Sequence, residues 1–270
     1  MNNIKVIVTL YAFVIGLCFG SFALATAWRI KKKRSFTRER SECEHCRHLL
    51  AAKDLVPLFS WLSQHGKCRY CHKKLSKLLP LSELTGGLVF AALYLAWPEA
   101  LGGVLNAARF VLWGIALVLL LILFFYDLQW YILPNKVIYP LWAVSAIDFA
   151  LRFMQTPTLK TVVMGCAAVA VGAGLFWLFY IVSKGAWIGF GDVRLGIAIG
   201  LLLGKPELAA VSLFLASLLG ILVALPSLLT KKRNMTSKLP FGPLLIVALI
   251  ITRLFGAKII AWYVARVLFI

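Results

Sequence analysis

The sequence alternates between long apolar runs and short polar breaks. A helix needs about 20 mainly apolar residues to cross a bilayer, and most of the runs reach this length. The sixth is shorter, which is typical of a helix that begins inside protein or water. The expected spans are 4–27, 79–97, 103–126, 136–153, 160–183, 191–204, 208–229 and 240–256. We therefore expect an all-α polytopic membrane protein with about eight transmembrane helices.

The two ends of the chain need separate interpretations. The first run is too long for the apolar part of a secretory signal, and a basic block follows it instead of a small-residue cleavage site. We interpret it as a retained transmembrane helix. Residues 257–270 either extend the last span or lie at the membrane interface.

Composition supports lipid as the solvent of this chain. Hydrophobic residues make up 61% of it and charged residues 14%, whereas soluble domains carry about 25% charged residues. The net charge is +19, and 14 of the 29 Lys and Arg residues lie between Arg29 and Lys77. Basic loops stay in the cytoplasm, so we expect segment 28–78 to be cytoplasmic and the N-terminus outside. Attraction to anionic lipid headgroups also accounts for the charge, so we expect membrane lipids and no nucleic acid as partners.

The remaining loops agree with this orientation. The inner connections would be 127–135, 184–190 and 230–239, and the outer ones 98–102, 154–159 and 205–207. The inner loop 230–239 contains KKRNMTSK, with four basic residues and no acid, whereas the outer loops are short and poor in charge. Two separate loops thus indicate the same topology.

Four of the six cysteines form two CxxC pairs, CEHC at 43–46 and CRYC at 68–71, separated by 21 residues. This spacing is typical of a zinc site with four cysteine ligands. A segment of about 50 residues has little core, so a metal would stabilise its fold. We expect Cys43, Cys46, Cys68 and Cys71 to hold a structural Zn²⁺ in a small zinc-knuckle-like domain. Four thiolates leave no open position for catalysis.

Two alternatives to four thiolate ligands stay open. The first is disulfide bonding, which is disfavoured in the reducing cytoplasm. The second is that one of the four histidines near the pairs replaces a cysteine as a metal ligand. Those histidines are His45, His48, His65 and His72. Cys18 and Cys166 stand alone in apolar runs, and we expect them to be small buried hydrophobic residues.

Four acids lie in or beside the spans, where an ionisable group is costly and is a candidate for function. Asp148 has Arg152 four residues later, so an ion pair within one helix explains it. Glu83 is expected to bond a neighbouring helix or to cap its own. Asp127 and Asp192 both fall at the cytoplasmic boundary in the expected topology, although 64 residues separate them.

Two carboxylates at one place suggest a dyad that shares a proton, because two like charges a few ångströms apart do not both ionise. The charged carboxylate takes a proton from water, and the protonated one polarises a peptide carbonyl. This is aspartyl protease chemistry. The pair titrates as a unit, so the sequence does not assign acid and base to Asp127 or Asp192.

Glycines and prolines near the two aspartates point to a peptide-binding region. Gly189 and Gly191 are expected to permit close approach of an extended substrate and backbone angles that other residues avoid. Pro134 and the run LPFGP at 239–243, which includes Gly242, break helices at the same level, and broken backbone at membrane depth lines cavities. We expect Gly189, Gly191, Pro134 and Gly242 to bind substrate.

Together these motifs resemble those of the type IV prepilin peptidases, a family of GxGD aspartyl proteases. The resemblance covers nearly the whole chain, with the motifs in the family's order. It rests on GSF at 20–22, the paired CxxC motifs with LVPLFSWL at 55–62, LSELTGGLVF at 81–90, D-x6-PN at 127–135, GFGDVRLGIAIGLLLG at 189–204 and LPFGPLL at 239–245.

The resemblance implies an aspartyl endopeptidase of the bacterial inner membrane with Asp127 and Asp192 as its catalytic residues. Such enzymes remove the short basic leader of type IV prepilins and of pseudopilins of type II secretion, on the cytoplasmic side and usually after a glycine. Many members also methylate the new N-terminus with S-adenosylmethionine, and their cysteine domain is associated with zinc. The expected domains are 1–27, the first transmembrane helix, 28–78, the cytoplasmic four-cysteine domain, and 79–270, the transmembrane aspartyl peptidase domain.

The chain departs from the family pattern at two places. After GSF the family usually has Leu-Asn, whereas this chain has ALATAWR, in the part linked to methylation. Two residues after the second aspartate the family usually has Lys, and this chain has Arg194. Neither departure changes the two aspartates.

Two other functions fit parts of the pattern. A presenilin-like protease shares Tyr126-Asp127 and the GxGD motif, but it cuts within transmembrane helices and is not expected to carry a loop with four cysteines. A zinc-anchored membrane scaffold or transporter would use the aspartates to bind a cation. Transport sites usually lie near the bilayer midplane, however, and these aspartates are expected at its boundary.

Overall fold

The structure is a computed structural model that describes residues 3–35, 40–97, 101–229 and 240–267. Helices dominate the described residues, and pairing between extended segments is limited there to two isolated bridges, Glu42 with Leu49 and Lys67 with Lys74. Clustering of contacts divides the chain into two compact units, Met1–Trp97 and Pro98–Ile270. The basic inner loop KKRNMTSK lies outside the described residues.

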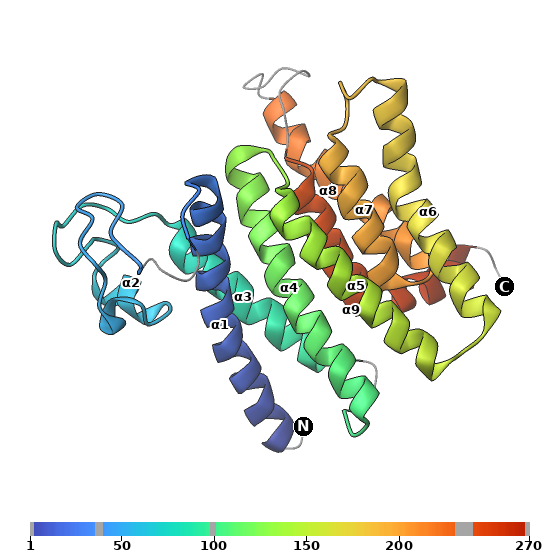
Figure 1. The fold of residues 1–270 in the computed structure, drawn as a ribbon, viewed down its shortest axis with the longest axis horizontal. Coiled ribbons are helices and arrows are strands. Elements are labelled where there is room, and N and C mark those ends of the chain that lie inside the picture. Colours follow the sequence, from blue (N-terminus) through green and yellow to red (C-terminus); the bar gives the residue numbers. More distant parts are fainter. Residues whose placement is uncertain (1–2, 36–39, 98–100, 230–239, 268–270) are drawn as a thin grey trace. The chain divides into compact units, whose positions relative to one another are not determined.

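The first unit contains two long helices with the cysteine-bearing segment between them. Its elements are α1 (Asn3–Lys31), the 3-10 turn η1 (Ala52–Asp54), α2 (Phe59–Ser63) and α3 (Leu78–Leu95). α1 and α3 lie side by side (Figure 1). Gly16 meets the backbone of Gly86, and Gly20 meets that of Ser82, so the helices are antiparallel. A Cβ at Gly20 would lie 2.1 Å from the Ser82 oxygen, which explains the need for glycine there.

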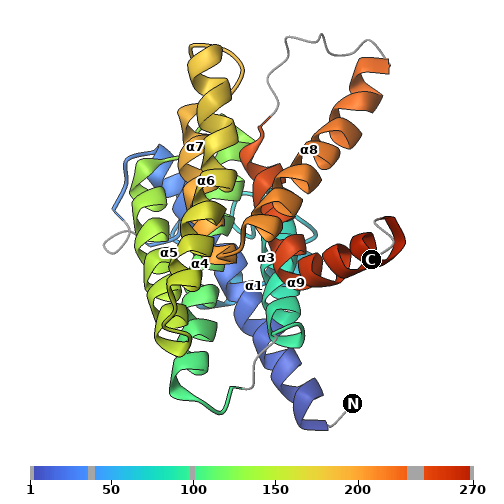
Figure 2. The same ribbon diagram turned by 90° about the vertical axis from the view of Figure 1, so that its right-hand side faces the viewer.

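The second unit is a helical bundle. Its described helices are α4 (Val104–Trp130), α5 (Asn135–Gln155), α6 (Leu159–Val182), α7 (Phe190–Leu203), α8 (Pro206–Leu229) and α9 (Gly242–Val267). α6 and α7 lie side by side (Figure 2) and touch through glycines, because a Cβ at Gly196 would lie 2.3 Å from the Gly172 oxygen. The core is apolar and includes Leu120, Phe125 and Ile199.

These helices confirm the expected polytopic membrane protein. Seven helices in the described part of the chain are long and apolar enough to cross a membrane, so the chain is an integral membrane protein. The expected span that is not among these seven is the sixth, which forms α7, a helix of only 14 residues. Eight of those 14 residues are buried, so this short helix is enclosed by its neighbours. Residues 257–267 continue α9 without a break in the helix.

The prediction that Cys18 and Cys166 are buried was wrong. Both are exposed on the outer faces of α1 and α6, respectively. An apolar thiol is compatible with a lipid-facing position, so the apolar sequence around it did not require burial within protein.

Candidate functional site

Asp127 lies near the C-terminal end of α4, where the helix stops. Tyr131 adopts a left-handed conformation with φ of 56°, and its N–H donates to the Asp127 carbonyl at 2.9 Å, which closes the last turn. Pro134 follows and serves as the N-cap of α5, with its carbonyl accepting from Val137 at 3.0 Å. The Asp127 residue is only 5% exposed. The break between α4 and α5 therefore leaves a buried carboxylate beside irregular backbone.

Gly242 provides the hydrogen-bond donor to this carboxylate. It is the first residue of α9, and its N–H donates to Oδ2 of Asp127 at 3.1 Å. The first N–H groups of a helix have no partner within it, and the helix dipole favours a negative group there. A Cβ at Gly242 would lie 2.7 Å from the same oxygen. The glycine thus permits a close approach that a larger residue would prevent.

Asp192 lies in the first turn of α7. Its N–H donates to the carbonyl of Gly189, the N-cap residue, at 3.1 Å. The side chain is half-buried. Asp192 and Asp127 are close enough for their charges to interact. The two carboxyl groups therefore lie near each other.

Leu133 links the surroundings of the two aspartates. It is buried, and its Cβ lies 3.1 Å from the position of a Cβ at Gly191, directly before Asp192. Its Cδ2 lies 3.2 Å from the corresponding position at Gly242, the partner of Asp127. The breaks after α4, before α7 and before α9 thus meet around one leucine.

The expected backbone role of two glycines needs correction. Gly189 has φ of −74°, and Gly191 is absent from the glycines with positive φ, so neither adopts angles that other residues avoid. Gly191 is instead restricted by space, because a side chain would press on Leu133. A Cβ at Gly189 would make only an ordinary contact, 3.6 Å from Oδ2 of Asp192.

Arg194 is a further residue of this region whose role the sequence did not explain. Its guanidinium donates to Oδ1 of Asn135, the first residue of α5, and lies over the Phe190 ring at 4.6 Å. The indole N–H of Trp142 donates to the Arg194 carbonyl at 2.8 Å. A flat guanidinium stacks and donates at once, which lysine does less well. The sequence contained a signal for this contact, because Asn135 follows Asp127 in the Pro-Asn step and the cation Arg194 follows Asp192.

The four cysteines of the first unit form a single cluster. One sulfur atom from each lies within 4.8 Å of all the others, and the Sγ atoms of Cys43 and Cys71 are 3.9 Å apart. A tetrahedral metal with bonds of about 2.3 Å places its sulfur ligands about 3.8 Å apart. The group contains Cys43, Cys46, Cys68 and Cys71 and no histidine. The four thiols therefore fit a metal ion.

Both CxxC loops fold in the same way. Cys43 donates its N–H to the His48 carbonyl at 3.0 Å, and Cys68 donates to Lys73 at 2.9 Å. The residues after the second cysteines, Arg47 and His72, have φ of 57° and 56°. This repeated turn directs two thiols of each loop to the same point, which the spacing in the sequence predicted.

The environment of Cys68 also favours a thiolate. Burial raises the pKa of the Cys68 thiol, but N–H groups of Cys71 and Tyr70 and the neighbouring thiols outweigh burial and lower this pKa to about 7. Two histidines make other contacts, because Nε2 of His45 lies 3.3 Å from the Lys74 carbonyl and the His48 ring stacks on Tyr70 with centroids 3.6 Å apart. Thiolate is the form that metals bind.

The carboxylate of Glu83 joins the cysteine-bearing segment to the membrane helices of the first unit. It lies near the start of α3, is 6% exposed, and accepts from the N–H of Leu58 at 2.7 Å. Glu83 was expected to bond a neighbouring helix or to cap its own, and this contact is instead with Leu58, the residue directly before α2.

Fold and site together define an integral membrane protein that combines paired carboxylates at helix ends with a separate cluster of four cysteines. Comparison with known proteins identifies the family within this class: the chain belongs to the type IV leader peptidase family. The family model described as "Type IV leader peptidase family" matches residues 114–225, and that described as "Bacterial Peptidase A24 N-terminal domain" matches residues 14–97.

Several curated relatives resemble the chain along most of their length. A prepilin leader peptidase/N-methyltransferase of Bacillus subtilis is 30% identical, over 95% of this chain and 98% of the relative. One of Aeromonas hydrophila is 32% identical, over 85% and 76%. A type 4 prepilin-like proteins leader peptide-processing enzyme of Escherichia coli O78:H11 is 34% identical, over 87% and 89%. No solved structure matches the chain.

Proposed function

We propose that this protein is an aspartyl endopeptidase that removes the short basic leader from type IV prepilins and related pseudopilins, with Asp127 and Asp192 as the catalytic pair. The observation that carries the proposal is that Leu133 lies against both Gly191, directly before Asp192, and Gly242, whose N–H donates to Asp127. Family membership and the names of the curated relatives support the substrate class.

In the proposed mechanism the two carboxyl groups share one proton. The charged carboxylate accepts a proton from a water molecule as that water attacks the scissile peptide carbonyl. The protonated carboxyl donates a hydrogen bond to the carbonyl oxygen and later a proton to the leaving amine. The Gly242 N–H holds Asp127 in orientation, and the dyad titrates as a pair.

The substrate would enter as an extended peptide, since helical hydrogen bonds hide the carbonyl to be cut. Gly189 and Gly191 lie beside Asp192 and Gly242 lies beside Asp127, and we propose that these glycines and Pro134 line its path. Pro134 contributes by ending the helical backbone between α4 and α5. Gly191 and Gly242 contribute by leaving room beside Leu133 and the carboxylates.

For the first unit we propose a structural Zn²⁺ held by Cys43, Cys46, Cys68 and Cys71. The sulfur distances and the exclusively thiol donor set support zinc. The metal would stabilise segment 28–78, whose described residues include few buried apolar side chains. We propose that this segment is a small cytoplasmic domain and that the catalytic pair lies at the same side of the inner membrane, with the N-terminus outside. The positive-inside rule supports this orientation.

We further propose methylation of the new N-terminus with S-adenosylmethionine as a second activity. The names of the Bacillus subtilis and Aeromonas hydrophila relatives include N-methyltransferase. Transfer of labelled methyl groups to the cleaved peptide, but not to a peptide whose N-terminus is blocked, tests this activity.

Cleavage of a defined peptide tests the peptidase proposal. The full chain in lipid nanodiscs is mixed with a peptide that has a basic leader, a Gly–Phe junction and an apolar helix, and the products are weighed by mass spectrometry. We expect a single cut after the glycine and little cutting of a peptide with valine in its place. Cutting only deep within the apolar helix would instead indicate a presenilin-like protease.

A further inference from the structure

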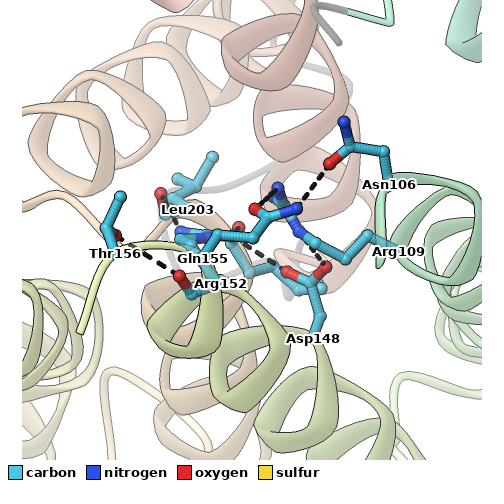
Figure 3. Close-up of polar contacts among 8 residues, drawn as sticks. Asn106, Arg109, Asp148, Arg152, Gln155, Thr156 and Leu203 are labelled. Atoms are coloured by element: carbon cyan, nitrogen blue, oxygen red, sulfur yellow. Dashed lines mark hydrogen bonds and ion pairs between the residues drawn. The ribbon is translucent and has the colours of Figure 1, made fainter. Parts of the chain in front are cut away.

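A buried cluster of charged side chains lies at the other end of α7 from Asp192. The helix ends at Leu203, and Gly204 follows with φ of 65°. Arg152 of α5 donates to the last carbonyls of α7, from Nη1 to Leu203 at 2.9 Å and from Nη2 to Leu202 at 2.8 Å (Figure 3). The final carbonyls of a helix have no partner within it, and a cation is favoured there. Arg152 therefore caps this short helix from outside.

Arg152 is itself held by Asp148, one turn earlier on α5. Nη2 of Arg152 lies 2.9 Å from Oδ2 of Asp148, and Nε of Arg109 on α4 lies 3.2 Å from Oδ1 (Figure 3). The side chain of Asp148 is fully buried, and that of Arg109 is 4% exposed. Gln155 accepts from Arg109 at 3.0 Å and donates to Asn106. One carboxylate thus joins α4, α5 and, through Arg152, α7.

Gly204 leaves the space that Arg152 occupies. A Cβ at this position would lie 1.8 Å from Nη1 of Arg152, so no other residue fits without moving the guanidinium. The left-handed backbone of Gly204 also favours glycine. The contact between α5 and the end of α7 therefore depends on both residues.

The contacts run along a parallel pair of helices. Trp142 of α5 donates to the Arg194 carbonyl near the start of α7, and Arg152 donates to carbonyls at its end. Asp192 lies 11 residues before Leu203, about 16 Å along a helix axis. A rigid helix held at its end transmits that position to its first turn. The same cluster includes Arg109 of α4, the helix that carries Asp127.

We infer that Arg152 is a positioning residue for the peptidase reaction. It fixes the position of α7 along its axis relative to α5, and thereby the position of Asp192 relative to Asp127. The inference rests on the proposed function. Without the guanidinium, the Leu202 and Leu203 carbonyls lose a hydrogen-bond donor within the bundle, and α7 shifts along its axis relative to α5. Misplacement of a catalytic group by about 1 Å can reduce a rate by about 100-fold.

The experiment measures kcat and KM for the leader peptide with the full chain in nanodiscs. We expect Arg152→Gln to lower kcat by about tenfold or more with KM changed by less than about twofold, because the proposed substrate path lies at the opposite end of α7. Arg152→Lys, whose ammonium still donates to a carbonyl, should recover part of the loss. Lys205→Gln, which removes an exposed cation beside Gly204, is the matched control and should keep wild-type values.

A second variant separates positioning from folding. Gly204→Ala should displace Arg152 without altering it and reproduce the kcat loss. In the double variant Gly204→Ala/Arg152→Gln the two losses should not multiply, because both act through one contact. Rates are expressed per folded protein, as judged by gel filtration and thermal unfolding.

Three results would overturn the inference: full kcat in Arg152→Gln, a loss confined to KM, or multiplied losses in the double variant. Failure of the proposed function looks different, since the wild type would then leave the peptide uncut or Asp127→Asn would still cut it.

Discussion

The backbone N–H of Gly242 donates to the carboxylate of Asp127 at 3.1 Å, although the two residues are 115 positions apart in the chain. The contact joins the first residue of α9 to the last turns of α4. It satisfies a helix donor and fixes one oxygen of a buried acid at the same time. The start of α9 is thus part of the support for the proposed catalytic pair.

Replacement of Gly242 by alanine tests this support. The added Cβ would lie 2.7 Å from Oδ2 of Asp127 and 3.2 Å from Cδ2 of Leu133, so the carboxylate must move. We expect kcat for leader removal to fall by about tenfold or more. Gly174→Ala is the control, because nothing lies within 4 Å of a Cβ at this helical position and alanine is the better helix former. Equal activity in both variants would exclude a role for the close approach at Gly242.

The sequence predicted most of the helices because membrane spans are set by a simple requirement for length and apolarity. The expected start of α7 at 191 and end at 204 differ by one residue from the observed Phe190–Leu203. The residue that caps the C-terminal end of α7 could not be predicted. Arg152 lies in another helix, and the local sequence identifies it only as the ion-pair partner of Asp148. That pair was confirmed, but Arg109 and the α7 carbonyls were missed.

Loss of one thiol tests the metal cluster. We expect Cys43→Ser or Cys68→Ser to abolish stoichiometric zinc in the purified protein and to expose the segment between the CxxC pairs to protease, because three thiols no longer close the site. Elemental analysis and limited proteolysis measure these effects. Cys166→Ser, which alters an exposed thiol of α6, should retain the metal. Unchanged zinc in the Cys43 and Cys68 variants would refute the site.

Asp54 gives the cysteine-bearing segment a dependence on pH. Burial raises the pKa of Asp54, but hydrogen bonds from Tyr70, Ala51 and Arg69, together with the Arg69 charge, outweigh burial and lower it. The carboxylate therefore adds stability at every pH above its unfolded pKa, and the contribution is lost as the pH falls through the lower folded pKa. We expect Asp54→Asn to lower the free energy of local opening at neutral pH by about 1 kcal/mol.

Hydrogen exchange across residues 43–75 measures this opening. The difference between wild type and Asp54→Asn should stay constant around neutrality and shrink only in the acid range. Loss of metal at low pH affects both proteins and cancels in the comparison. Glu44→Gln, at an exposed acid in the same segment, should open like wild type. A difference that already disappears near neutral pH would contradict this assignment to the Asp54 carboxylate.

The candidate site was only partly readable from the sequence. The spacing of the cysteines predicted their convergence because each CxxC forms a local turn. The placement of Asp127 and Asp192 at one membrane boundary predicted their approach. The contacts of Leu133 and of the Gly242 N–H were not predicted. They arise where three non-helical segments, after α4, before α7 and before α9, pack together, and no local sequence pattern describes that packing. The prediction of unusual backbone angles at Gly189 and Gly191 was wrong, because steric space and not φ restricts Gly191.

The most direct test of the proposed function is the rate of leader removal by Asp127→Asn and Asp192→Asn, each measured on full-length protein inserted in nanodiscs. An amide keeps the size of the side chain but neither accepts the proton from water nor donates one to the leaving group. We expect each variant alone to lose at least about 100-fold in kcat while its insertion and zinc content stay at wild-type levels. Glu207→Gln, at an exposed acid of α8, should cut normally. Leader removal at the wild-type rate by either aspartate variant would contradict the catalytic pair.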